Sequence, residues 1–231
     1  MKVASYTGPG TYVINDNSLP ENLILYKSAA TVAITRVIVS VAGIGVIADV
    51  GEKAIKSLTN NGNLHTAGSD QQYLILPLAD GYHGGKRTTI EITYTGVGEL
   101  DVYYNSLQEG SLYIVTKREK LFAKQPAKFS KFAQLMFSVT HPNSQVNVTM
   151  KNGTRHNGTI LEFQIMNTKM SSNNMAFKND YAVIDNDEMI FEEVEFIPEV
   201  DAEAFVTSYL ITDEASVERK IQKLNAKAME G

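Results

Sequence analysis

The sequence contains neither cysteine nor tryptophan. Without cysteine the chain forms no disulfide, no thiolate zinc site and no thiol nucleophile. Without tryptophan a sugar-binding surface would have to rely on tyrosine rings, and large aromatic side chains also serve cores and interfaces. The tyrosines that could form such a surface are expected to pack in the core or at interfaces instead. They are Tyr73, Tyr82, Tyr94, Tyr103 and Tyr104.

Charged residues are scarce, at 20% of the chain, and the formal net charge is −5. Nucleic-acid binding normally requires a basic patch or stripe, and the one dense basic stretch runs from residue 117 to residue 131. Because it contains Pro126 and has no clear period, we interpret this stretch as a solvated linker. Contact with anionic lipid or nucleic acid is the alternative, but we expect no specific nucleic-acid partner. The cations of the stretch are Lys117, Arg118, Lys120, Lys124, Lys128 and Lys131.

No hydrophobic run is long enough to span a bilayer as a helix. A transmembrane helix needs about 20 apolar residues, and the longest run, residues 37–50, is interrupted by Ser40, Gly43, Gly45 and Asp49. Residues 1–8 lack the apolar core of a signal peptide. The sequence therefore predicts a soluble protein that is made in the cytoplasm and carries no signal peptide.

Nucleotide and metal signatures are weak. Residues 43–48 read Gly-Ile-Gly-Val-Ile-Ala, but a dinucleotide site needs this turn to open a helix, and residues 49–51 are a poor helix start. We expect a bend at this position, not a cofactor site. Four histidines show no metal-ligand spacing and are predicted to lie in loops, namely His65, His83, His141 and His156.

Two acidic clusters could carry chemistry. Asp180 and residues 185–188 offer oxygen ligands for calcium, but the glycine and the final glutamate of a calcium-binding loop are missing. Paired carboxylates for glycoside cleavage could come from Glu192, Glu193, Glu195 and Glu199. We interpret the first cluster as a solvated turn and the second as the outward positions of strands. The sequence thus predicts no catalytic, no cofactor-binding and no metal-binding residues.

Short apolar or alternating segments between turn residues are abundant, and this spacing is typical of a β-sandwich or barrel. We predict an all-β fold of two tandem β-sandwiches, residues 1–118 and 119–231. One helix is predicted, over residues 215–228 behind the cap Asp213, with Val217, Ile221 and Leu224 on one face. Strands are predicted over residues 11–14, 23–26, 32–41, 73–78, 89–94, 100–104, 135–140, 146–150, 159–166, 181–184, 189–196 and 204–210, and residues 112–115 are a further candidate.

The two halves repeat each other weakly, at a separation of about 100 residues. Any two strands share an alternating pattern, so chance is one explanation for the repeat. A tandem of two similar sandwiches is the other explanation, and we favour it. The repeated blocks are residues 36–41 with 134–139, 90–94 with 190–196, and 99–103 with 203–207.

These blocks give the chain a pattern that resembles the double jelly-roll major capsid proteins of tailless icosahedral phages with an internal membrane, the corticovirus and tectivirus type. The resemblance implies two jelly rolls standing upright in a viral shell and three chains in each pseudo-hexagonal capsomer. It implies a virion protein whose partners are itself, as a homotrimer, and neighbouring capsomers. Penton or minor capsid proteins and the internal membrane are further implied contacts.

Two other classes of protein remain open at this stage. A carbohydrate-binding or adhesin module of a phage or bacterium would bind a glycan through loop aromatics. A β-sandwich hydrolase would assemble its site from distant residues. The helix predicted over residues 215–228 also leaves two options, because its apolar face could pack on protein, or its lysines and Arg219 could face anionic lipid.

Overall fold

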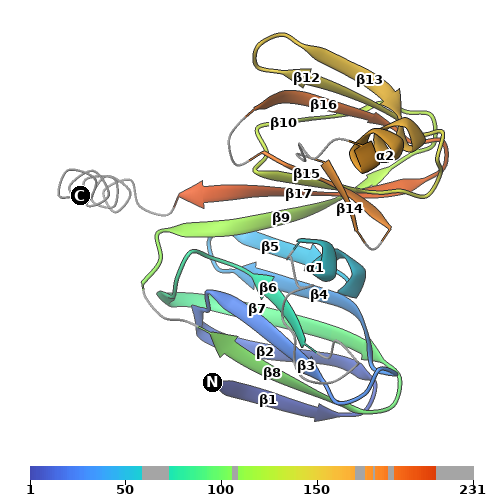
Figure 1. Cartoon of the computed structure of the whole chain (residues 1–231). Coiled ribbons are helices and arrows are strands. Elements are labelled where there is room, and N and C mark those ends of the chain that lie inside the picture. The colour runs from blue at the N-terminus through green and yellow to red at the C-terminus, as the bar shows by residue number, and fades with distance from the viewer. Residues whose placement is uncertain (59–72, 106–108, 170–174, 179, 187–189, 212–231) are drawn as a thin grey trace.

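The computed structural model describes the chain except for residues 59–72, 106–108, 170–174, 179, 187–189 and 212–231 (Figure 1). Strands make up most of the described residues, and the helices α1 (Glu52–Leu58) and α2 (Ile160–Lys169) are short. The predicted all-β class is therefore confirmed. Within this described part, neither the length nor the hydropathy of any helix is sufficient to cross a membrane.

Eight strands build the first half of the molecule as two layers. One layer has the order β1-β8-β3-β6 and the other has the order β2-β7-β4-β5. Two sheets of four strands with this connectivity form a jelly roll. The strands are β1 (Lys2–Thr7), β2 (Gly10–Leu19), β3 (Asn22–Lys27), β4 (Ala33–Val41), β5 (Gly45–Val50), β6 (Tyr73–Pro77), β7 (His83–Thr95) and β8 (Glu99–Asn105).

Nine strands build the second half, and they repeat the same order. Its layers are β9-β17-β11-β15, extended by β14, and β10-β16-β12-β13. Strands β9 to β13 therefore take the places of β1 to β5, and β15 to β17 take those of β6 to β8. These strands are β9 (Leu112–Leu121), β10 (Ala127–Ser130), β11 (Gln134–Ser138), β12 (Gln145–Met150), β13 (Arg155–Thr159), β14 (Met175–Lys178), β15 (Tyr181–Asp185), β16 (Phe191–Ile197) and β17 (Ala202–Ile211).

Two of the three sequence repeats fall on strands that occupy the same place in each half. Residues 90–94 lie in β7 and residues 190–196 fall on its counterpart β16, while the blocks at 99–103 and 203–207 lie in the counterparts β8 and β17. The third pair does not match, because residues 36–41 lie in β4 whereas the block that begins at residue 134 forms β11, the counterpart of β3. Shared alternation explains the third pair.

The two halves join edge to edge, which corrects the expectation of a linker with separate sheets on either side. Strand β5 lies parallel to β9, with Ala48 opposite Thr116, so one nine-stranded sheet runs through both halves (Figure 1). Residues 117–121 complete β9 and residues 127–130 form β10. The sequence obscured β9 because Lys117 to Lys120 are exposed on both faces of the strand, although all ten residues of β9 pair with β17.

Two apolar cores lie on opposite faces of β11, β15 and β17. Leu135 and Phe137 belong to the core of the second half, whereas Met136 and Phe205 point the other way and join the core of the first half. Successive side chains of a strand alternate between faces, so one face of these strands serves each core. Ile55 of α1 is fully buried in the shared cluster. The halves are therefore packed together through an apolar contact.

The helices differ from the prediction. Residues 159–166 were expected to form a strand, but α2 begins at Ile160 behind a capping box. The Thr159 amide and hydroxyl donate to the Glu162 carboxylate at 2.7 and 3.0 Å, and the Glu162 amide donates back to the Thr159 hydroxyl oxygen at 3.3 Å. Helix α1 was not predicted, and the helix predicted over residues 215–228, with its cap Asp213, lies outside the described residues.

Candidate assembly surfaces

The glycine-rich stretch at residues 43–48 begins in a turn, as predicted, and its residues from Gly45 onward belong to β5. It connects β4 to β5, and its two glycines have φ angles of 83° and 99°, a left-handed region that glycine reaches without strain. Strand β5 follows this turn directly, and α1 begins only at Glu52. A helix N-terminus therefore does not face the turn.

The histidines lie apart from one another, and two of them contradict the expectation of loop positions. His83 is buried at the start of β7, 4.4 Å between ring centroids from Tyr113, and His156 is exposed in β13. Strand β7 begins earlier than the strand predicted over residues 89–94, and no strand was predicted over residues 155–158. His141 lies in a turn, where its Nδ1 accepts a hydrogen bond from the Asn143 amide at 3.3 Å. His65 lies outside the described residues.

The proposed calcium ligands are occupied by other contacts or lie outside the described residues. Asn186 is buried, its side-chain amide donates to the carbonyl oxygens of Phe132 and Phe191 at 3.2 Å, and its Oδ1 accepts from the Phe191 amide at 2.9 Å. Asp180 forms an ion pair with Lys53 of the first half at 2.6 Å. Among the described residues, no three histidine or acidic side chains gather into a group that could hold a metal ion.

The glutamates considered as a hydrolytic pair lie on the outer side of the second half. Glu193 pairs with Lys128 at 3.1 Å, and Glu195 accepts a hydrogen bond from the side-chain amide of Asn147 at 2.7 Å. Each carboxylate is thus paired with a neighbouring strand. This arrangement agrees with the interpretation that strand alternation places them outward. Glu199 lies 3.6 Å from Lys124, and Glu192 lines the groove described next.

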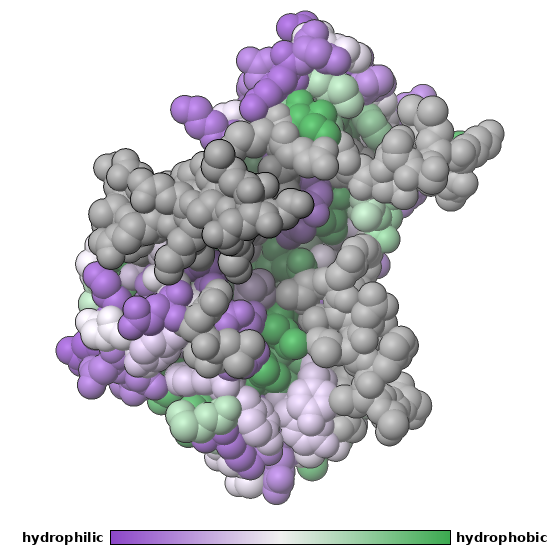
Figure 2. All heavy atoms as spheres, turned by 60° about the vertical axis from the view of Figure 1, so that its left-hand side comes forward, coloured by the Kyte–Doolittle hydropathy of each residue, from purple (hydrophilic) through white to green (hydrophobic). Residues whose placement is uncertain are grey.

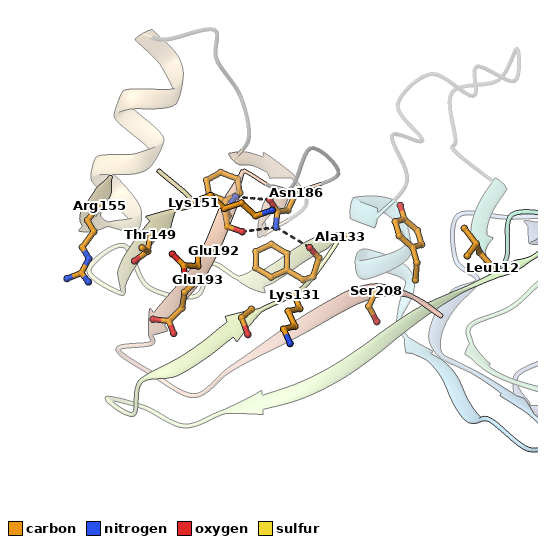
Figure 3. Close-up of a pocket in the computed structure, with 14 residues that line it drawn as sticks. Leu112, Lys131, Ala133, Thr149, Lys151, Arg155, Asn186, Glu192, Glu193 and Ser208 are labelled. Carbon is orange, nitrogen blue, oxygen red and sulfur yellow. Dashed lines mark hydrogen bonds between the residues drawn. The ribbon is translucent and has the colours of Figure 1, made fainter. Parts of the chain in front are cut away.

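A groove of about 1040 Å³ opens at one end of the second half (Figure 3). Its apolar lining comes from the loop between β10 and β11, the start of β16 and the end of β17, and Asn186 joins the first two of these segments by hydrogen bonds. Figure 2 brings this side forward and shows apolar residues in the hollow at its middle. The groove is suited to burying apolar side chains. The lining residues are Leu112, Ser130, Lys131, Phe132, Ala133, Thr149, Lys151, Arg155, Asn186, Phe191, Glu192, Glu193, Ser208 and Tyr209.

A polar cleft lies between the two halves, on the side of α1. Arg118 pairs with Glu203 at 2.7 Å, and the Tyr181 hydroxyl donates a short hydrogen bond to the same carboxylate. Burial, and then the Glu203 carboxylate, raises the pKa of the Tyr181 hydroxyl, which therefore remains a donor. Across the cleft, Lys27 is 5% exposed and pairs with Glu52 at 2.7 Å. Each of these contacts lies within one half and fixes one wall of the cleft, whereas the ion pair between Lys53 and Asp180 joins the two halves.

The outer face of the sheet β1-β8-β3-β6 is rich in apolar and aromatic side chains. Tyr103, Ile24 and Ile75 form one row across β8, β3 and β6. The rings of Tyr26 and Tyr73 lie beside them, with centroids 4.6 Å apart. All five side chains are half-buried and point away from the core of the jelly roll. An apolar face of this kind is typical of a surface that packs on another molecule.

The five tyrosines considered for sugar binding do not form one platform. Tyr94 and Tyr104 are buried in the core, and Tyr82 is partly exposed near the join between the halves. Only Tyr73 and Tyr103 share the outer face described above. The preference for core and interface packing is confirmed for the two buried rings.

Comparison with known proteins gives similarity in structure alone. No family model matches the sequence, and no curated protein matches it. The major capsid protein of STIV, a Sulfolobus turreted icosahedral virus, aligns with a TM-score of 0.60 and 9% identity, covering 92% of this chain and 96% of its own. The major capsid protein P2 of bacteriophage PM2 aligns with a TM-score of 0.60 and 11% identity, covering 90% and 94%. The chain therefore has, over at least 90% of its length, the fold seen in these viral major capsid proteins.

Proposed function

We propose that this chain is a viral major capsid protein, a structural component of an icosahedral virion without enzymatic activity. The observation that carries the proposal is the pair of jelly rolls with identical strand order, fused through one sheet and matched over most of the chain by two major capsid proteins. No comparison favours the carbohydrate-binding or hydrolase alternatives.

The assembly unit in this proposal is a homotrimer that forms a pseudo-hexagonal capsomer. A six-fold arrangement needs six similar units, and three chains with two jelly rolls each supply them. An obligate contact between such subunits buries over about 2,000 Å² and is more apolar than ordinary surface. The apolar outer face of β1-β8-β3-β6 and the groove on the second half both provide surface of that character.

The division into two jelly rolls also belongs to this proposal. The sequence predicted units of residues 1–118 and 119–231, and that boundary falls inside β9. Because β9 occupies the place of β1 in its own half, we propose that the second jelly roll begins at Leu112.

Further partners remain predictions from the resemblance. Neighbouring capsomers, penton or minor capsid proteins and an internal membrane are expected contacts, and specific nucleic acid is not. Contact with the membrane depends on the basic residues between 213 and 231, which lie outside the described residues. Deletion of that segment should impair particle assembly while each jelly roll stays folded.

Solution mass tests the proposal directly. Light scattering coupled to gel filtration should give three times the chain mass of 25.5 kDa, unchanged over a tenfold dilution, and electron microscopy of the pure protein should show hexagonal particles. A protein that stays monomeric at high concentration would contradict the capsid function. A glycan array would then test the carbohydrate-binding alternative.

A further inference from the structure

The contact between the two halves of one chain has two components. The first is an edge join, in which β5 of the first half runs beside β9 of the second. The second is a face contact, in which α1 packs on the outer face of β9-β17-β11-β15. Ile55 of α1 lies in one buried cluster with Met136, Val183 and Phe205 of that face, and Lys53 of α1 pairs with Asp180 beside it.

Each component has a counterpart elsewhere in the chain, because the two halves share one strand order. The counterpart of β5 is β13, and the counterpart of β9 is β1. Both β13 and β1 end their sheets in the described part of the chain. The counterpart of α1 is α2, and the counterpart of the face on β9-β17-β11-β15 is the outer face of β1-β8-β3-β6. A single chain therefore contains this contact once, between its own halves. It also carries the two surfaces of a second contact of the same kind: α2 with β13 on the second half, and β1 with the outer face of β1-β8-β3-β6 on the first.

The chemistry of the two separate sides fits a contact of the same kind. On α1, Ile55 is fully buried, whereas on α2 Leu161 is 47% exposed and Ile165 is 48% exposed. The face on β1-β8-β3-β6 carries Ile24 and Tyr103 where its counterpart carries buried apolar side chains. Open sheet edges are normally covered or blunted in native proteins. The apolar residues of α2, β3 and β8 thus have the composition of surfaces that become buried, while β1 and β13 contribute open sheet edges with polar side chains.

We propose that α2 and β13 of one chain pack against β1 and the outer face of β1-β8-β3-β6 of the next chain. This inference rests on the proposed trimer, and its partner is a second copy of the chain. The contact is heterologous, since the two surfaces differ, and a heterologous contact gives a closed ring only if its rotation closes. Three such contacts alternating with three contacts within chains would make a ring of six jelly rolls.

Engineered cysteines test which surfaces meet, because the natural sequence contains no cysteine. One variant carries Leu161→Cys on α2 and Ile24→Cys on the outer face, and two further variants carry each change alone. A bismaleimide linker of about 10 Å is added, and products are separated on a denaturing gel. The double variant should give covalent dimers and trimers. Each single variant should stay monomeric on the gel, because a heterologous contact does not bring identical residues together.

A matched control uses Val13, which is 54% exposed on β2, the sheet edge farthest from β5. Pairing Val13→Cys with Leu161→Cys should give no covalent product. In light scattering, Leu161→Glu should shift the trimer towards monomer by at least tenfold in dissociation constant, while Val13→Glu should not.

The outcomes separate this inference from the proposed function. If the protein is trimeric but the double variant does not crosslink, or a single variant crosslinks to itself, the surfaces are assigned wrongly while the capsid function stands. If the natural protein is monomeric, the capsid function fails and the inference fails with it. Circular dichroism of each variant shows whether a lost trimer reflects a lost fold.

Discussion

Two tyrosine hydroxyls in the core show how much a single hydrogen bond matters here. The Tyr94 hydroxyl accepts a hydrogen bond from the Gly8 amide at 2.8 Å and donates one to the Tyr6 carbonyl oxygen at 3.2 Å. The Tyr104 hydroxyl is buried without a partner among the described residues, and burial raises its pKa to about 12. A buried polar group that lacks a partner costs free energy that a bonded one does not.

Removing each hydroxyl should therefore have opposite effects. Tyr104→Phe should raise the free energy of unfolding by up to about 1 kcal/mol, since it deletes an unsatisfied group, and Tyr94→Phe should lower it by about 1–2 kcal/mol. Urea unfolding followed by fluorescence measures both values under one set of conditions. A lower stability for Tyr104→Phe would mean that its hydroxyl has a partner in solution.

Acid should weaken the contact around Glu52. Burial alone would raise the pKa of this carboxyl, but hydrogen bonds from Lys27, Lys56 and the Ile34 amide outweigh burial and leave the pKa below its usual value of 4.5. A lowered pKa in the folded state contributes stability that is present above the unfolded-state pKa and is lost as pH falls through the folded value. Unfolding free energy should thus decline below about pH 4.5.

The variant Glu52→Gln isolates this effect. It leaves the Lys27 ammonium buried without its counter-charge, so it should cost roughly 3–5 kcal/mol at pH 7, as the breaking of buried pairs does. Its stability should fall less steeply than that of the natural protein below about pH 4.5. Equal slopes in the two proteins would show that Glu52 does not contribute to the acid sensitivity.

At the scale of elements, α1 packs the core of the first half against the outer face of β9-β17-β11-β15. Ile55 is fully buried and lies in one cluster with Met136 and Phe205 of the second half. Ile55→Ala should lower the free energy of unfolding by about 2–5 kcal/mol, the usual range for a buried isoleucine. Val97→Ala, at a position 82% exposed, should change it by less than about 0.5 kcal/mol. Chemical denaturation measures both, and similar values for the two variants would contradict the packing role of α1.

Strands with one buried face and one exposed face were predictable from the sequence. Elements whose conformation depends on pairing or packing with distant residues were not. Residues 90–94 alternate because one side of β7 faces a core, so their pattern identified the strand. The alternation of buried and exposed residues in β9 ends at Lys117 to Lys120, where all four side chains are exposed. These residues are extended because they pair with β17. Helix α2 did carry a signal, the Thr159 and Glu162 capping box, which the alternation that follows it concealed.

The candidate surfaces were less predictable than the fold. The sequence indicated that tyrosines serve packing, but only strand register shows that Tyr103, Ile24 and Ile75 form one row. The neighbours Tyr103 and Ile24 are 79 positions apart in the chain, and the neighbours Ile24 and Ile75 are 51 apart. An assembly surface is made of positions that pairing brings together, and no local motif marks them.

At the scale of the whole molecule, the shared sheet should make unfolding cooperative. The first half cannot lose β5 without exposing the edge of β9, and the second half supplies Phe205 to the core of the first. Calorimetry of the natural protein, under conditions where assembly is reversed, should give one transition whose calorimetric and van't Hoff enthalpies agree. Two separate transitions would show that the join contributes little.

The position of β9 also determines an order of events during translation. Strands β1 to β8 form a complete jelly roll, so the first half has all eight of its own strands once residue 105 has left the ribosome. Strand β9 then emerges against the finished edge of β5, but its antiparallel partner β17 is the last strand to be made. Domains generally fold in the order of their synthesis. The finished first half thus offers the edge of β5 to the nascent chain, and we expect β9 to meet that edge near Thr116 before its long pairing with β17 forms.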